Sequence, residues 1–119
     1  MRRFARSVKH ALRGVYHASK MEKNFRLEII AAILVAILAY LLPVTAQERV
    51  LLVFVVAGVL VIELINTAIE RVVDMLKPRV HPYARIAKDV MAAAVLIASI
   101  GAMMIGLGIF LPYILKIFS

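Results

Sequence analysis

Four polar side chains interrupt an apolar stretch in the middle of the chain. They are Glu63, Asn66, Glu70 and Asp74. Because neighbours in this set are three or four residues apart, a helix places all four within about 80° of one another, as one stripe that rises about 16 Å. Carboxylates inside a membrane helix are energetically unfavourable and usually functional, which makes this stripe the first candidate site. A structural polar network between helices is the alternative.

The stripe provides two kinds of chemistry along its length. Glu63 is expected to lie deepest, where a poorly solvated carboxylate can act as general base toward a lipid hydroxyl. Glu70 and Asp74 are expected nearer to water, where Mg²⁺ can use one or two carboxylates together with phosphate oxygens. Glu22, with Asn24, precedes the first apolar stretch at the same expected level. It could complete the metal site.

A second polar group begins the last apolar stretch. Lys88 and Asp89 stand there, and His81 lies in the connection before them. Lys88 could pair with a phosphate group, although lysines at helix ends are more often membrane anchors. The chain has no Walker-type glycine loop and no glycine-rich kinase strand, so metal-bound carboxylates and basic side chains would hold any nucleotide. Together the residues suggest phosphate chemistry at a membrane surface.

Composition places this chemistry in a bilayer. The chain has 119 residues, of which 64% are hydrophobic, and its mean hydropathy is +0.94. A small soluble fold cannot bury that much apolar surface. Cysteine is absent, which excludes a disulfide framework and a thiolate metal site. The net charge is +8, but eight of the 15 basic residues fall in the first 26 positions. This distribution favours anionic lipid over nucleic acid as the partner.

Three apolar stretches predict three membrane helices, over 27–44, 50–76 and 82–116. The middle one decides where the stripe lies. Its uncharged part, 50–62, is too short to cross a hydrocarbon core of about 30 Å, so the helix must continue and carry Glu63 and Asn66 into the membrane. Between Glu63 and Pro78 the sequence has no glycine and no other proline that would break this helix. The predicted fold class is an all-α membrane protein, with residues 1–119 forming a single domain.

Residues 1–26 predict a separate surface helix and its lead-in. Apolar residues with helical spacing share one face: Phe4, Val8, Ala11, Leu12 and Val15. Basic residues fall on the opposite face: Arg6, Lys9, Arg13 and Lys20. This pattern is typical of an amphipathic helix lying on the membrane surface. A disordered basic tail is the alternative.

The distribution of lysine and arginine predicts the orientation. The N-terminal segment has eight of these residues and the 77–88 connection has four, whereas the first turn has only Arg49 and the C-terminal end only Lys116. The positive-inside rule then places the N-terminus in the cytoplasm and the C-terminus outside, as in a multi-pass protein of the cell inner (cytoplasmic) membrane. We expect the first stretch to be retained rather than cleaved as a signal peptide, because its basic leader is long and two further spans follow.

Three segments resemble the prokaryotic diacylglycerol kinase family. They are ELINTAIERVVD at 63–74, AKD at 87–89 followed by AAAV at 92–95, and EKNFR at 22–26. The likeness covers essentially the whole chain, including the order of its elements. It implies a homotrimer of three-span protomers, each with an N-terminal surface helix. It also implies phosphorylation of a lipid alcohol at the cytoplasmic face, with ATP as the donor and Mg²⁺ as the cofactor.

The resemblance also implies a role for each polar position. Glu63 is similar to the catalytic base, and Glu22 with Glu70 to the metal-binding pair. Asn66 is similar to the active-site amide. The positions that resemble nucleotide contacts are Glu22, Glu70, Asp74, His81, Lys88 and Asp89.

The family has a diacylglycerol branch and an undecaprenol branch. The EKNFR segment, the NTAIE segment at 66–70 and His81-Pro82 look more like the undecaprenol branch. Two positions depart from the patterns. Val80 replaces the aromatic residue of the diacylglycerol branch, and Glu28 stands where undecaprenol-type sequences often have histidine. Undecaprenol is therefore the favoured substrate, with diacylglycerol as the alternative.

A different class of function would also explain a buried acid. A small proton- or cation-coupled transporter could use Glu63 as its ion site. That hypothesis gives no role to Glu22, Asp74, Lys88 or Asp89. A structural membrane scaffold would leave the whole stripe unexplained.

Overall fold

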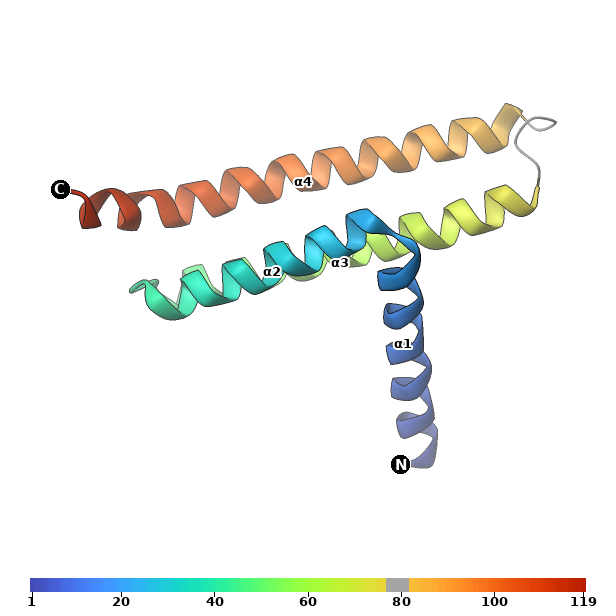
Figure 1. Cartoon of the computed structure of the whole chain (residues 1–119), viewed down its shortest axis with the longest axis horizontal. Helices are drawn as coiled ribbons and strands as arrows, with labels where there is room; N and C mark the ends of the chain where they lie inside the picture. Colours follow the sequence, from blue (N-terminus) through green and yellow to red (C-terminus); the bar gives the residue numbers. More distant parts are fainter. Residues whose placement is uncertain (77–81) are drawn as a thin grey trace.

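Four helices account for nearly all of the chain. The computed structural model describes residues 1–76 and 82–119. Within these ranges the helices are α1 (Arg2–Met21), α2 (Lys23–Leu41), α3 (Ala46–Met75) and α4 (Pro82–Ile117), and there is no strand. α3 packs against both α2 and α4, while α1 turns steeply away from the other three (Figure 1). The predicted all-helical class with three long apolar helices is confirmed.

α2, α3 and α4 are each long and apolar enough to cross a membrane. They have 19, 30 and 36 residues. At 1.5 Å per residue, α2 is about 28 Å long and just matches a hydrocarbon core, whereas α3 and α4 are about 45 and 54 Å long. Most of the surplus lies at one end, where the last turns of α3 and the first turns of α4 extend beyond the start of α2, and the last turns of α4 extend past the α2–α3 turn at the other end (Figure 1).

A capping box fixes the start of α3 ahead of the apolar stretch that begins at 50. The Glu48 backbone N–H donates to the Thr45 hydroxyl at 3.1 Å, and the Thr45 N–H donates to the Glu48 carboxylate at 2.9 Å. These two bonds satisfy backbone donors that a helix N-terminus leaves unpaired. Because Gln47, Glu48 and Arg49 are polar, hydropathy alone places the start of this helix too late, although the Thr45-to-Glu48 spacing is visible in the sequence.

The corner between α1 and α2 is held by side chains from both helices. Glu22 has an extended backbone, with φ −118° and ψ 115°, and breaks the helix there. The Arg26 guanidinium donates to the backbone carbonyls of Ser19 at 2.9 Å and Lys20 at 3.2 Å, which caps the end of α1. Ala18 and Phe25 are buried at the same corner. These contacts set the direction of α1 relative to α2.

The opposite end of the bundle contains a small apolar core, here called the turn cluster. It consists of Leu42, Val44, Leu52, Ile109 and Phe110. Beside it, the Tyr113 hydroxyl on α4 donates a hydrogen bond to the Glu48 carboxylate on α3. The α2–α3 turn, the start of α3 and the end of α4 are therefore tied together.

Tyr113→Phe is expected to lower the midpoint of thermal unfolding by a few degrees, because it removes a hydrogen bond to a charged acceptor. Unfolding in detergent micelles, followed by circular dichroism, measures the change. Tyr40→Phe is the matched control, because Tyr40 is 86% exposed near the same end of the molecule. Equal midpoints for the two variants would show that the Tyr113–Glu48 bond does not stabilise the fold.

Candidate functional site

Glu63 is buried in the middle of α3 and yet borders open space. Only 3% of the residue is exposed. Glu63 is one of the residues that line a cavity of about 330 Å³. Thr67, one turn further along, is also buried, and its hydroxyl donates to the Glu63 backbone carbonyl at 3.0 Å. The Thr67 hydroxyl therefore has its hydrogen-bond acceptor within its own helix. It does not occupy the Glu63 carboxylate, which stays available to a ligand in the cavity.

Three helices contribute to this cavity. α3 provides Glu63, Asn66 and Glu70, while α2 provides Asn24. α4 provides a mostly apolar wall: Ala92, Val95, Leu96 and Ser99. Three of the four stripe residues therefore share one space, as helical spacing requires. The cavity offers carboxylate and amide groups on one side and hydrocarbon on the other.

Asn66 connects the stripe residues to one another. Its Nδ2 donates to Oε1 of Glu70 at 3.4 Å, one helical turn away. This contact restrains the Glu70 carboxylate beside the cavity. The carboxylates of Glu22, Glu28 and Glu70 also lie near enough to Glu63 to repel it electrostatically. Four acidic groups from α2, α3 and the α1–α2 corner therefore create a negative potential that attracts cations.

Asp74 lies outside the cavity, on the extended part of α3. Its Oδ1 pairs with Lys88 Nζ at 2.6 Å, and the two side chains are 53% and 37% exposed. This pair joins the last turns of α3 to the first turns of α4. Asp89, next to Lys88, is exposed. The stripe thus has two parts, a buried one around Glu63 and a water-accessible one around the Asp74–Lys88 pair. His81 lies outside the described residues.

The donors around the cavity fit Mg²⁺ better than a tightly chelated metal. In residues 1–76 and 82–119, no three histidine, cysteine or acidic side chains converge closely enough to hold a metal ion by themselves. Mg²⁺ does not need such a group, because it binds one or two carboxylates and takes its other ligands from water and substrate phosphates. The restrained Glu70 carboxylate is one donor of that kind on the cavity wall, whereas Glu22 is not part of the cavity lining and interacts electrostatically with Glu63.

Glu28 and Ser99 also lie at this site, although the stripe pattern does not single them out. Glu28 interacts electrostatically with Glu63, and Ser99 lines the cavity. Each carries a signal in the sequence: Glu28 is the one charged residue in 27–44, and Ser99 the one serine in 90–115. Being the one charged residue or the one serine of a stretch does not place either residue near Glu63. Their positions depend on how α2 and α4 pack against α3.

Comparisons with known proteins agree with the resemblance. The family model described as prokaryotic diacylglycerol kinase matches residues 9–110, which include every site residue named above. The chain is 38% identical to the undecaprenol kinase of Bacillus subtilis over 112 residues, covering 94% of this chain and 91% of the relative. It is 39% identical to the diacylglycerol kinase of Escherichia coli strain K12 over 100 residues, covering 84% and 82%. The diacylglycerol kinase of Synechocystis is 37% identical over 112 residues, covering 93% of this chain and 64% of the longer relative.

Proposed function

Because this chain belongs to the prokaryotic diacylglycerol kinase family, a family of lipid kinases, we propose that it uses ATP and Mg²⁺ to phosphorylate the hydroxyl group of a membrane lipid alcohol. One observation carries the proposal beyond the family name. Glu63 is buried in a membrane-length helix and shares a cavity with Asn66 and Glu70. A carboxylate in the middle of a membrane-spanning helix would be within reach of a lipid hydroxyl.

The proposed reaction gives each of these residues a role. The lipid hydroxyl donates its proton to the Glu63 carboxylate while its oxygen attacks the terminal phosphorus of ATP. The bond to the bridging oxygen breaks, and ADP leaves with that oxygen. Glu22 and Glu70 would hold Mg²⁺, and the bound ion would neutralise part of the negative charge of the phosphates. Asn66 acts as a positioning residue, because its amide restrains the Glu70 carboxylate.

The water-accessible part of the stripe would bind the nucleotide. Lys88 would contact its phosphates, exchanging its present partner Asp74 for the incoming anion. Asp74, Asp89 and His81 would complete the nucleotide contacts. About 16 Å of α3 separates Glu63 from Asp74. The stripe is therefore long enough to connect a substrate dissolved in the bilayer with one dissolved in water.

Undecaprenol is the favoured lipid in this proposal. Support comes from the EKNFR and NTAIE segments. The match to the Bacillus subtilis undecaprenol kinase also covers more of both chains than the match to the Escherichia coli diacylglycerol kinase, at nearly equal identity. Diacylglycerol, which would yield phosphatidic acid, is the alternative.

Three apolar helices make the chain a multi-pass membrane protein, and we propose how it is arranged. The N-terminus and the acidic end of α3 would face the cytoplasm across the inner membrane, with the C-terminus outside. α1 would lie on the membrane surface, because its apolar residues Phe4 and Leu12 are 72% and 65% exposed within the chain. Three copies would assemble as a homotrimer, as the family resemblance implies.

A side-by-side assay tests the proposed function. The purified protein is incubated with ATP labelled on its terminal phosphate, Mg²⁺, and either undecaprenol or dioleoylglycerol in mixed micelles. We expect label to move to the lipid, with a higher kcat/KM for undecaprenol. Equal kcat/KM values would remove the preference between the lipids. Absence of label in both lipids, together with ATP-independent ion flux in vesicles, would favour the transporter instead.

A further inference from the structure

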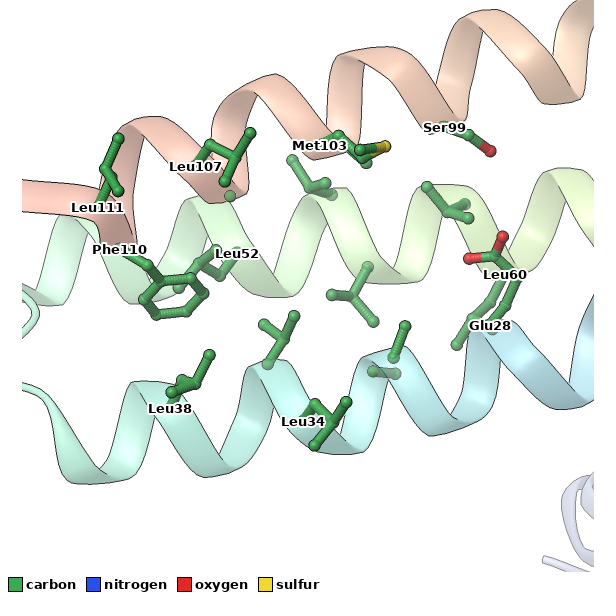
Figure 2. A pocket seen from close by; sticks show the side chains of 18 of the residues that line it. Glu28, Leu34, Leu38, Leu52, Leu60, Ser99, Met103, Leu107, Phe110 and Leu111 are labelled. Atoms are coloured by element: carbon green, nitrogen blue, oxygen red, sulfur yellow. The ribbon is translucent and has the colours of Figure 1, made fainter. Parts of the chain in front are cut away.

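One face of α4 is directed toward α3 along most of its length. Ser99 and Phe110 on this face line an apolar pocket that α2, α3 and α4 enclose together (Figure 2). Ala92 lines the candidate cavity beside α3, and Lys88 pairs with Asp74 of α3. From Lys88 to Phe110 these residues are separated by four, seven and eleven positions. Such spacings return to the same side of a helix, so the contacts define a single face.

Arg85 continues this face toward the end of the bundle that carries the acidic stripe. It precedes Lys88 by three residues and Ala92 by seven, which places it on the side of α4 that faces α3. The residue is exposed. Among residues 1–76 and 82–119, the ion pair of Lys88 with Asp74 does not include Arg85, and Arg85 forms no ion pair of its own. No described carboxylate therefore neutralises its charge.

Arg85 also lies at a level that water can reach. Asn24, in the first turn of α2, lines the same cavity as Ala92, so the start of α2 is close to the level of Ala92. Arg85 comes seven residues earlier, about 10 Å further along the axis of α4. It belongs to the first turn of α4, which extends beyond the start of α2 (Figure 1). Because α2 just matches the hydrocarbon core, a water-soluble anion can approach Arg85.

The candidate site has a large excess of negative charge. Six of the chain's seven acidic residues belong to the site or adjoin it, and only Glu48 lies at the far end. The phosphates of a nucleotide add further negative charge, of which a bound Mg²⁺ offsets only a part. Lys88 is already paired with an acid. A second cation beside Lys88 would lower the repulsion that the phosphates meet.

We propose that Arg85 binds an inner phosphate of the nucleotide, one that ADP retains. The proposal rests on the kinase function proposed above, in which the terminal phosphate lies beside Glu63 and the rest of the nucleotide extends toward water. Lys88 is nearer to the cavity and meets the terminal end, whereas Arg85 is about 4.5 Å further out. A guanidinium binds phosphate through two parallel hydrogen bonds. Arg85 thus orients the phosphate chain as well as attracting it.

Two substitutions of Arg85 and one control test this contact. Arg85→Gln removes the charge, whereas Arg85→Lys keeps the charge and loses the paired hydrogen bonds. Arg49→Gln is the matched control, because Arg49 is also exposed and lies in the first turn of α3, at the other end of the bundle. All three side chains are replaced at exposed positions, so the helices should pack as in the wild type.

Binding of a fluorescent methylanthraniloyl-ADP is measured in detergent micelles with Mg²⁺ and without a lipid substrate. This readout does not need phosphate transfer. We expect the Kd to rise about 10-fold in Arg85→Gln and about threefold in Arg85→Lys, and to stay unchanged in Arg49→Gln. In phosphate transfer to the lipid alcohol, Arg85→Gln should raise the KM for ATP by about 10-fold at an unchanged kcat, because the inner phosphate is held equally in the ground and transition states.

Each other outcome has a definite meaning. Unchanged ADP binding and an unchanged KM for ATP in Arg85→Gln would overturn the proposal and leave the kinase function standing. An altered response to the phosphatidylglycerol content of vesicles, at an unchanged KM for ATP, would show that Arg85 contacts lipid headgroups, which also overturns it. ADP binding that depends on Arg85, without phosphate transfer by the wild type, would support the contact and refute the kinase function. Absence of nucleotide binding by the wild type would refute both.

Discussion

Replacing Glu63 by glutamine is expected to reduce kcat for phosphate transfer by about 1,000-fold, because a neutral amide cannot accept the hydroxyl proton. The substitution hardly changes the size of the side chain, and the residue is only 3% exposed. The helices should therefore pack as before. The measurement is transfer of labelled phosphate from ATP to a lipid alcohol, with circular dichroism and oligomer size as checks on folding.

Glu48→Gln is the matched control for this variant. It makes the same substitution on the same helix, at the end away from the site. Glutamine keeps an oxygen that can accept from the Thr45 N–H and the Tyr113 hydroxyl. We expect nearly wild-type activity. Transfer at the wild-type rate by Glu63→Gln would exclude Glu63 as the base, and an equal loss in Glu48→Gln would trace the effect to general disturbance of α3.

The part of the site that lies on one helix could be predicted from the sequence. Glu63, Asn66 and Glu70 share a cavity because helical periodicity alone determines their common face. The length of α3 followed from an equally simple constraint, since 50–62 is too short to cross the bilayer. The exception was the start of α3, where Thr45 and Glu48 form a polar cap that hydropathy does not detect.

The part of the site that depends on helix packing could not be predicted. Ser99 and Glu28 reach the Glu63 region only because α4 and α2 flank α3 at particular heights. Neighbours of membrane helices are selected by shape and close packing, and no local period records that choice. Asp74 illustrates the same limit. It shares the face of Glu63 but lies beyond the cavity, where it pairs with Lys88.

The second large effect is expected at Glu70. Glu70→Gln should reduce phosphate transfer by about 100-fold and raise the Mg²⁺ concentration needed for half-maximal activity, because an amide oxygen is a weaker ligand for Mg²⁺ than a carboxylate. Binding can be measured separately from catalysis with Mn²⁺ as a paramagnetic substitute and a non-hydrolysable ATP analogue. We expect weaker Mn²⁺ binding in Glu70→Gln and wild-type binding in Glu48→Gln, which lies at the other end of α3.

Comparison of Glu70→Gln with Glu63→Gln separates the two parts of the proposed reaction. If Glu63 transfers the proton and Glu70 holds the metal, Glu63→Gln should lose rate at an unchanged Mg²⁺ requirement, whereas excess Mg²⁺ should partly restore Glu70→Gln. A wild-type Mg²⁺ response in Glu70→Gln would mean that this carboxylate is not a ligand. Its contact with Asn66 at 3.4 Å would then serve only to order the cavity wall. A shifted Mg²⁺ requirement in both variants would instead mean that the metal lies deeper, beside Glu63.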